Sequence, residues 1–201
     1  MRSLLLCALL VLLGGCFSEP TPKAPSPAAI AITPEVEAKL RKVAFQAARE
    51  GDTKTLDEYF AMKRPVNEKN ERGDTLLVVA AYNGQLAAVN RILTQPGVEI
   101  DVRNGMGLTA LTAAAYQGHV EIAKAILHAG ADVNSASPSG KTSLMFASQS
   151  GKLDMVDCLL EAGADPALKD AKGKTALVLA RTQGAEGVAA RLEKALAKRS
   201  E

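Results

Sequence analysis

The stretch GKTSLMFASQSGKLDMVDCLLEAGAD, residues 140–165, contains one full copy of the pattern that sets the fold of this chain. Its Gly-x-Thr start, two apolar segments and closing Gly-Ala-Asp recur along the sequence. Two sets of glycines keep a spacing of 33 or 34 residues: Gly73, Gly107, Gly140 and Gly173, and Gly51, Gly84, Gly118, Gly151 and Gly184. A fixed period of this length predicts a stacked repeat array, and such arrays mostly bind other molecules rather than catalyse reactions.

Further columns come into register when the copies are aligned on these glycines. A threonine, a leucine and an alanine follow at fixed offsets: Thr75, Leu77, Ala80; Thr109, Leu111, Ala114; Thr142, Leu144, Ala147; Thr175, Leu177, Ala180. The threonine predicts a helix N-cap, and leucine and alanine three residues apart share one helix face. A glycine then ends the helix, and a second helix follows with its own apolar stripe, for example Leu153, Val156, Leu159 and Leu160.

These residues resemble the ankyrin repeat family. The closest likeness lies in Gly118-His119-Val120 and in Gly130-Ala131-Asp132-Val133-Asn134, and the resemblance covers roughly residues 36–199. It implies an all-α solenoid of about five helix-turn-helix repeats joined by β-hairpin-like loops. The domain is expected at 35–199, with a partial cap at about 36–69 and repeats at about 70–103, 104–136, 137–169 and 170–199.

The sequence departs from the family pattern at two places. The family tetrapeptide T-P-L-H is here T-L-L-V, T-A-L-T, T-S-L-M and T-A-L-V, which puts the family's side-chain bonding at the hairpin in doubt but leaves the fold unaffected. One extra residue near Gln95-Pro96-Gly97 lengthens a single loop.

The N-terminus has the pattern of a secretory signal. Arg2 precedes an apolar run, Leu4–Leu13, that is too short to span a bilayer, which needs about 20 apolar residues. The run ends in Leu13-Gly14-Gly15-Cys16, which resembles the lipobox of bacterial lipoproteins. The resemblance implies cleavage after Gly15 and a diacylglycerol and an N-acyl chain on Cys16, whereas the plainer alternative is an ordinary cleaved signal. Several acyl chains would make a stable anchor.

A proline-rich tether follows the signal. Residues 16–34 hold Cys16 and five prolines and cannot form a core, so they favour extended polyproline II structure. Eighteen residues at about 3.1 Å each reach at most about 55 Å from the membrane. By resemblance to bacterial sorting rules, Phe17 after the cysteine favours the inner leaflet of the outer membrane, facing the periplasm.

Composition and motif content exclude several classes of function. The chain has 201 residues, 24 Lys and Arg against 22 Asp and Glu, and therefore no basic surplus of the kind that nucleic-acid binding needs. No G-x-S-x-G, P-loop or H-E-x-x-H motif occurs, so we expect no enzyme. His119 and His128 are nine residues apart, which does not suit a metal site. We expect no cofactor and a monomer.

Cys158 is the one cysteine that remains in the expected mature repeat domain, so no intramolecular disulfide can form. One interpretation is a partly buried apolar filler in a second helix. The other is a redox-sensitive thiol, which an oxidising compartment would make testable.

The resemblance also implies a binding surface, because in similar arrays the concave side carries the variable positions. These lie beside the hairpin glycine and just before the helix-ending glycine: Glu71, Arg72, Asp74, Met106, Leu108, Lys141, Lys172 and Lys174, and Tyr82, Asn83, Tyr116, Gln117 and Gln149. Two tyrosines fall in one slot of adjacent repeats, beside apolar Met106 and Leu108. Such groups with a polar rim are typical of binding hot spots.

The leading hypothesis is a lipid-anchored periplasmic module that binds or sequesters a protein partner through this concave face. Similar bacterial proteins suggest two narrower roles: an immunity protein that neutralises a periplasm-acting antibacterial toxin, and an accessory protein to a catalase in peroxide defence. A general envelope scaffold with several weak partners is the alternative of a different class. The sequence does not discriminate among them.

Overall fold

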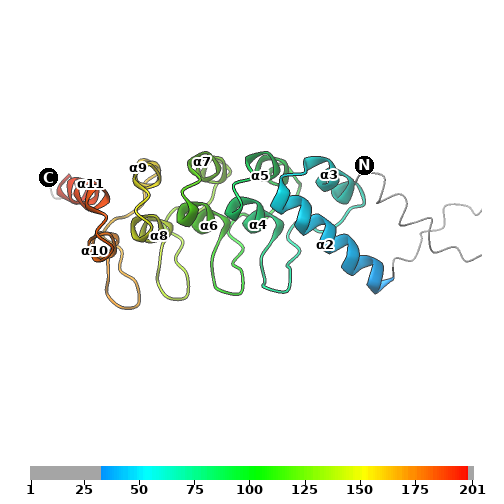
Figure 1. The fold of residues 1–201 in the computed structure, drawn as a ribbon, viewed down its shortest axis with the longest axis horizontal. Helices are drawn as coiled ribbons and strands as arrows, with labels where there is room; N and C mark the ends of the chain where they lie inside the picture. The colour runs from blue at the N-terminus through cyan, green and yellow to red at the C-terminus, as the bar shows by residue number, and fades with distance from the viewer. Residues whose placement is uncertain (1–32, 199–201) are drawn as a thin grey trace, which may run out of the picture.

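The computed structural model describes residues 33–198, and these residues form ten α-helices in two tiers with a row of loops along one edge (Figure 1). The inner tier, next to the loops, comprises α2 Pro34–Glu50, α4 Leu76–Tyr82, α6 Ala110–Gln117, α8 Ser143–Gln149 and α10 Ala176–Thr182. The outer tier comprises α3 Thr53–Ala61, α5 Leu86–Leu93, α7 Val120–His128, α9 Leu153–Glu161 and α11 Glu186–Ala197. The predicted all-α repeat solenoid is confirmed. None of the helices described is long and apolar enough to cross a membrane.

Each inner helix from α4 onward begins at the threonine that the sequence pattern predicts. Thr75, Thr109, Thr142 and Thr175 are extended at the N-cap, and each hydroxyl accepts a hydrogen bond from the backbone N–H three residues later, over 3.3–3.4 Å. This bond satisfies a donor that the helix itself cannot pair. The same column of threonines therefore fixes where four helices start.

The helix-ending glycines do two things at once. Gly84 takes a φ of 75°, which lets the chain turn sharply out of α4. Its bare Cα also leaves room for the next repeat, because a Cβ added at Gly84 would lie 2.9 Å from the ring of His119. Gly118 is covered in the same way by Lys152. His119 is therefore a packing residue.

The core runs between the tiers along the whole array. The predicted leucine and alanine of α4, α6 and α8 are buried, whereas in α10 Ala180 is buried and Leu177 only half-buried. The outer helices add buried aliphatic groups: Val89, Ile92, Ile122, Ile126, Val156 and Leu159. The predicted stripe of α9 is wrong at Leu153, which is 41% exposed. Leu153 lies at the solvent-facing start of the helix, and Met155 takes the buried place instead.

The N-terminal cap begins slightly earlier than the sequence indicates. Pro34, which the sequence analysis assigns to the tether, is the first residue of α2, and the Thr33 hydroxyl caps the helix. Pro is favoured there because its missing N–H would be unpaired in any case. The signal, Cys16 and the tether up to residue 32 lie outside the described residues.

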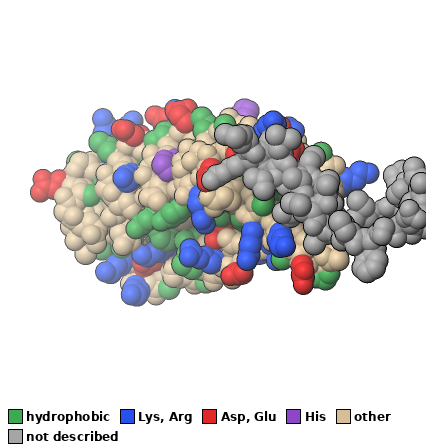
Figure 2. Space-filling model, turned by 45° about the vertical axis from the view of Figure 1, so that its right-hand side comes forward, with side chains coloured by type: hydrophobic (Ala, Val, Ile, Leu, Met, Phe, Trp, Pro, Cys, Tyr) green, Lys and Arg blue, Asp and Glu red, His purple; other side chains and the backbone are tan. Residues whose placement is uncertain are grey.

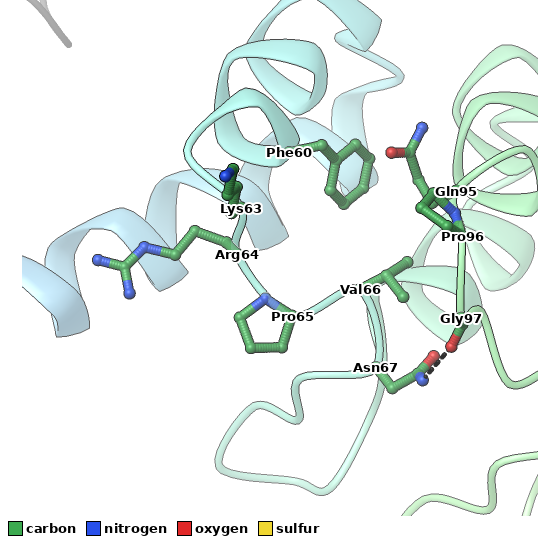
Figure 3. A pocket seen from close by; sticks show the side chains of 9 residues that line it. All are labelled: Phe60, Lys63, Arg64, Pro65, Val66, Asn67, Gln95, Pro96 and Gly97. Atoms are coloured by element: carbon green, nitrogen blue, oxygen red, sulfur yellow. Dashed lines mark hydrogen bonds between the residues drawn. The ribbon is translucent and has the colours of Figure 1, made fainter.

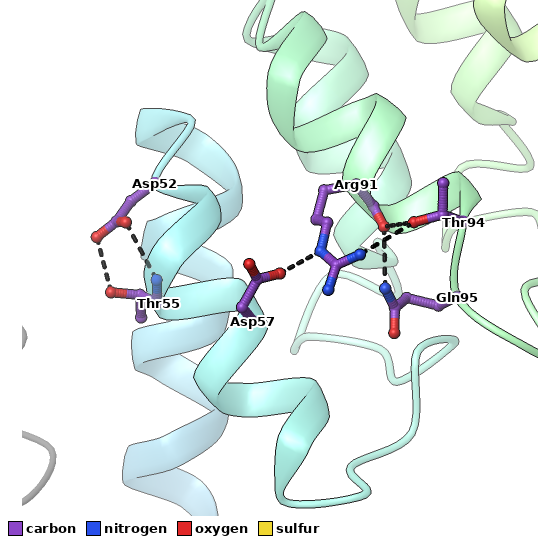
Figure 4. A network of polar contacts seen from close by, with 6 residues as sticks. All are labelled: Asp52, Thr55, Asp57, Arg91, Thr94 and Gln95. Carbon is purple, nitrogen blue, oxygen red and sulfur yellow. Dashed lines mark hydrogen bonds and ion pairs between the residues drawn. The ribbon is translucent and has the colours of Figure 1, made fainter.

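Polar pairs tie the cap to the next repeat. Arg91 of α5 pairs with Asp57 of α3, and its carbonyl accepts hydrogen bonds from Thr94 and Gln95 (Figure 4). In the same figure Asp52 caps α3 by accepting from the Thr55 hydroxyl and backbone N–H, which lowers the pKa of Asp52. A similar pair, Arg191 with Asp157, joins α11 to α9.

Candidate functional site

Four loops, here called fingers 1 to 4, precede the inner helices: residues 70–74, 104–108, 137–141 and 170–174. Each is closed by a backbone hydrogen bond of 2.9–3.0 Å between its first and fifth residues. In three fingers the first side chain also accepts from two backbone N–H groups over 2.8–3.0 Å: Asn70, Asn104 and Asp170. The fingers are therefore pre-formed hairpin-like loops, with isolated bridges at Lys69–Thr75 and Ala136–Thr142.

The fingers share one surface with the last turns of the inner helices, here called the finger face. The contact that shows this joins Lys141 of finger 3 to Gln149 at the end of α8, with Nζ to Oε1 at 2.8 Å. Gln149 occupies the slot of Tyr82 and Tyr116 in the two preceding repeats. Leu108 and Asp74 occupy the slot of Lys141 in fingers 2 and 1.

An aromatic cluster lies at the centre of the finger face. The Tyr116 ring meets the Phe146 ring edge to face, with centroids 6.4 Å apart. The Lys141 ammonium lies 5.4 Å from the Phe146 centroid, a cation–π geometry. Sequence reasoning missed Phe146, because it lies three residues before Gln149 and outside the slots expected to vary. Only the folded structure brings its ring against that of Tyr116 in the preceding repeat.

The apolar residues predicted for binding are exposed. Met106 is 71% exposed at the tip of finger 2, and Tyr82 and Tyr116 are 47% and 48% exposed. Single exposed apolar groups are ordinary, but three on adjacent repeats of one face are typical of interfaces.

The remaining predicted residues divide by their exposure. Glu71, Arg72, Asn83 and Lys172 are exposed, whereas Asp74, Leu108, Gln117, Lys141, Gln149 and Lys174 are half-buried. Two of them make hydrogen bonds within the array. The Asp74 carboxylate accepts from the side-chain amides of Asn70 and Asn104, and the Asn83 amide donates to the Val79 carbonyl at 2.8 Å. Cys16 lies outside the described residues.

The fingers are linked to one another unevenly. The Gly105 N–H donates to the Arg72 carbonyl at 3.1 Å, and the Ala171 N–H donates to the Ser139 carbonyl at 2.9 Å. The equivalent position between fingers 2 and 3 is Pro138, which has no N–H to give to the Met106 carbonyl. Arg103 partly compensates by bridging to Ser135 Oγ and the Ala136 carbonyl, both at 3.0 Å.

A second link is incomplete at the same junction. Asn67 and Asn134 each accept from a backbone N–H of the next repeat, while their amide groups donate to the carbonyls of Gly97 and Gly163. Asp101 takes the equivalent place and accepts from the Asp132 N–H at 3.0 Å, but its buried Oδ1 has no hydrogen-bond partner. The carbonyl of Gly130 is equivalent to those of Gly97 and Gly163. The Asp101 carboxylate has no N–H to donate to it, whereas an asparagine amide would.

We expect Asp101→Asn to stabilise the array. The new amide would donate to the Gly130 carbonyl as Asn67 and Asn134 do at their junctions, which is worth about 0.5–1.5 kcal/mol. Urea unfolding followed by circular dichroism measures the change. Asn134→Asp is the reverse substitution and should destabilise by a similar amount; equal stability of all three chains would contradict the assignment.

We next considered a metal site, the free cysteine and the hollow in the described residues. No group of three or more His, Cys, Asp or Glu residues within 33–198 could hold a metal ion. Cys158 is buried, and burial raises the pKa of its thiol, as expected of the apolar filler rather than of a reactive thiolate. A hollow of about 430 Å³ is lined by Phe60, Arg64, Val66 and Pro96 with five neighbouring residues (Figure 3).

Comparison with known proteins gives the family. Residues 44–137 match a family profile described as "Ankyrin repeats (3 copies)", and residues 126–180 match one described as "Ankyrin repeats (many copies)". Together the two matches span about two thirds of the chain.

Similar stretches occur in animal proteins. The chain is 37% identical over 67 residues to Alpha-latrocrustotoxin-Lt1a of Latrodectus tredecimguttatus, which covers 33% of this chain and 5% of the toxin. It is 34% identical over 91 residues to human Ankyrin repeat and SOCS box protein 3, covering 44% and 18% of the two chains. Ankyrin repeat domain-containing protein 49 of Bos taurus is 31% identical over 84 residues, covering 42% and 34%.

The aligned stretches thus cover from about a twentieth to about a third of these relatives' own lengths, and the likeness extends to the repeats alone. The repeats in turn carry the fold and an interaction surface, and both matching profiles describe ankyrin repeats. The Thr-capped helices, the fingers and the two matching profiles lead to one conclusion: the chain is an ankyrin repeat domain-containing protein and a protein-interaction module.

Proposed function

We propose that this protein is a lipid-anchored periplasmic module that holds or sequesters one protein partner on its finger face, without turnover. The observation that carries the proposal is the row of exposed apolar groups on adjacent repeats: Tyr82, Met106 and Tyr116. They lie beside fingers that are already closed by hydrogen bonds, so binding orders little backbone. Pre-formed loops and rigid aromatic anchors together favour a specific contact.

The anchoring half of the proposal rests on the sequence. The lipobox-like Leu13-Gly14-Gly15-Cys16 and the proline-rich residues after it support a mature chain tethered by acyl groups on Cys16. The outer membrane, facing the periplasm, is the proposed location. Fractionation of bacteria expressing the full chain tests this. The wild type is expected in the membrane fraction and Cys16→Ala outside it; the same membrane partition for both would refute the lipid anchor.

The nature of the partner is tested by affinity capture. The full-length chain is retrieved from a detergent extract of its own cells, and the retained proteins are identified and quantified by mass spectrometry. A Tyr82→Ala/Tyr116→Ala chain serves as the control for the finger face. One stoichiometric partner that the control loses supports sequestration.

The identity of the retained protein separates the narrower roles. A toxin would make the chain an immunity protein, and a catalase would make it an accessory in peroxide defence. A broad, weak set of proteins retained equally by wild type and control would refute sequestration and favour an envelope scaffold.

A further inference from the structure

The charge on the finger face changes sign along the array. Finger 1 is mixed, with Glu71, Arg72 and Asp74, whereas fingers 3 and 4 carry three lysines: Lys141, Lys172 and Lys174. The aromatic cluster lies between these two ends. Figure 2 shows a strip of hydrophobic side chains along the array, with Lys and Arg side chains and several Asp and Glu side chains along the edge below it.

None of the three lysines forms an ion pair of 4 Å or less with a carboxylate within residues 33–198. The ion pairs there involve other groups, and Lys141 instead donates to Gln149 and lies over the Phe146 ring. This geometry holds its charge beside Tyr116 without cancelling it.

One carboxylate, Asp170, lies among these lysines. It accepts from the backbone N–H groups of Lys174 and Lys172, both at 2.9 Å. The Lys174 bond is the main cause that lowers the pKa of Asp170, and the charges of Lys141 and Lys174 add to it. The cluster of three lysines and one aspartate therefore keeps a positive excess at neutral pH.

We propose that the partner presents an acidic segment next to an apolar anchor. Its carboxylates would lie against Lys141, Lys172 and Lys174, and its apolar side chain against Tyr116 and Met106. This inference rests on the proposed function and adds the chemistry and the direction of the partner: its acidic end points toward α10. Complementary charge of this kind speeds encounter and fixes register.

The opposite end of the same face argues for a polypeptide rather than a uniform polyanion. A nucleic-acid backbone or an anionic bilayer presents negative charge continuously, so it would also meet Glu71 and Asp74. A protein segment can change from acidic to apolar or basic within a few residues, which matches the lysine, aromatic and mixed zones in order.

A random 12-residue peptide library displayed on phage tests the proposal on the full-length chain. We expect the selected peptides to be rich in Asp and Glu beside an aromatic residue or leucine. A synthetic copy should bind Lys141→Glu/Lys172→Glu/Lys174→Glu at least about tenfold more weakly, and more weakly with added salt. Lys172→Glu/Lys174→Glu, which keeps the Lys141–Phe146 contact, should show a smaller loss in the same direction.

The matched control is Lys39→Glu/Lys42→Glu/Lys54→Glu, which changes the net charge equally at exposed positions of α2 and α3. It should bind the peptide as the wild type does.

Selected peptides without acidic residues, or binding that does not depend on the three finger lysines, would overturn the proposal of an acidic partner segment and leave the proposed function standing. Acidic peptides that bind Tyr82→Ala/Tyr116→Ala normally would instead refute the finger face. Retention on phosphatidylglycerol vesicles that the lysine triple variant loses, in place of peptide binding, would make the lysines a membrane contact.

Discussion

The chain with both Tyr82 and Tyr116 replaced by alanine is expected to bind its captured partner at least about 100-fold more weakly, while its fold stays intact. Truncating one interface hot spot costs about 2 kcal/mol or more, and each 1.4 kcal/mol is a tenfold change in affinity. Both rings are about half exposed, so the binding energy they supply is not already used in the core. Calorimetry with the purified partner measures the loss.

The cost to folding should be small for the same reason. Tyr116 meets the Phe146 ring edge to face, a contact worth about 0.5–1.5 kcal/mol beyond its area. The matched control is Leu86→Ala/Leu153→Ala, which removes two apolar groups of similar exposure from the outer helices. It should leave affinity unchanged. Equal weakening by both double variants, or by neither, would remove the tyrosines from the interface.

Much of the fold follows from local chemistry that a sequence displays directly. Thr109 has to cap a helix because its hydroxyl is the nearest acceptor for the N–H of Thr112, and that bond needs no knowledge of the other repeats. The period of 33 or 34 residues then stacks the copies. For this reason the starts of α4, α6, α8 and α10, the hairpin-like loops and the repeat array were predictable.

The rest depends on how neighbouring repeats meet. Leu153 is apolar and falls near the stripe of α9, but the side of the helix that it occupies faces solvent. Phe146 reaches Tyr116 of the preceding repeat, and Lys141 reaches Gln149 eight residues further on. Such pairs follow from the register between helices and fingers, which a single sequence does not specify.

The incomplete junction between fingers 2 and 3 illustrates the same limit. Pro138 and Asp101 are both visible in the sequence, but the hydrogen bonds that they fail to make are recognised only by comparison with the equivalent residues of other repeats. Those residues, which do make the bonds, are Gly105 and Ala171 for Pro138, and Asn67 and Asn134 for Asp101. The absent Pro138 bond is the one that the Met106 carbonyl would accept, so the most exposed apolar side chain of the face lies on a finger that lacks the backbone bond to the next finger.

Gly140→Ala and Gly173→Ala are expected to differ sharply in stability although they are the same substitution at equivalent positions. Both glycines have positive φ, 75° and 72°, so alanine is strained at either one by about 1–2 kcal/mol. At Gly173 nothing lies within 4 Å of the added Cβ. At Gly140 the Cβ would lie 2.8 Å from the Ala171 nitrogen and 3.0 Å from the Asp170 Cα.

The extra loss of stability expected for Gly140→Ala arises because the backbone of Asp170 and Ala171 is held by hydrogen bonds and cannot easily move away from the new Cβ. Ala171 is held by its hydrogen bond to the Ser139 carbonyl, and Asp170 by its bonds to Lys172 and Lys174. Displacing them breaks the link between fingers 3 and 4, so we expect Gly140→Ala to lose about 1–3 kcal/mol more than Gly173→Ala. Urea unfolding gives the difference, and faster hydrogen exchange at the Ala171 amide locates it. Similar losses in the two variants would mean that φ alone explains these glycines and that the fingers do not pack against one another closely enough to act as one binding face.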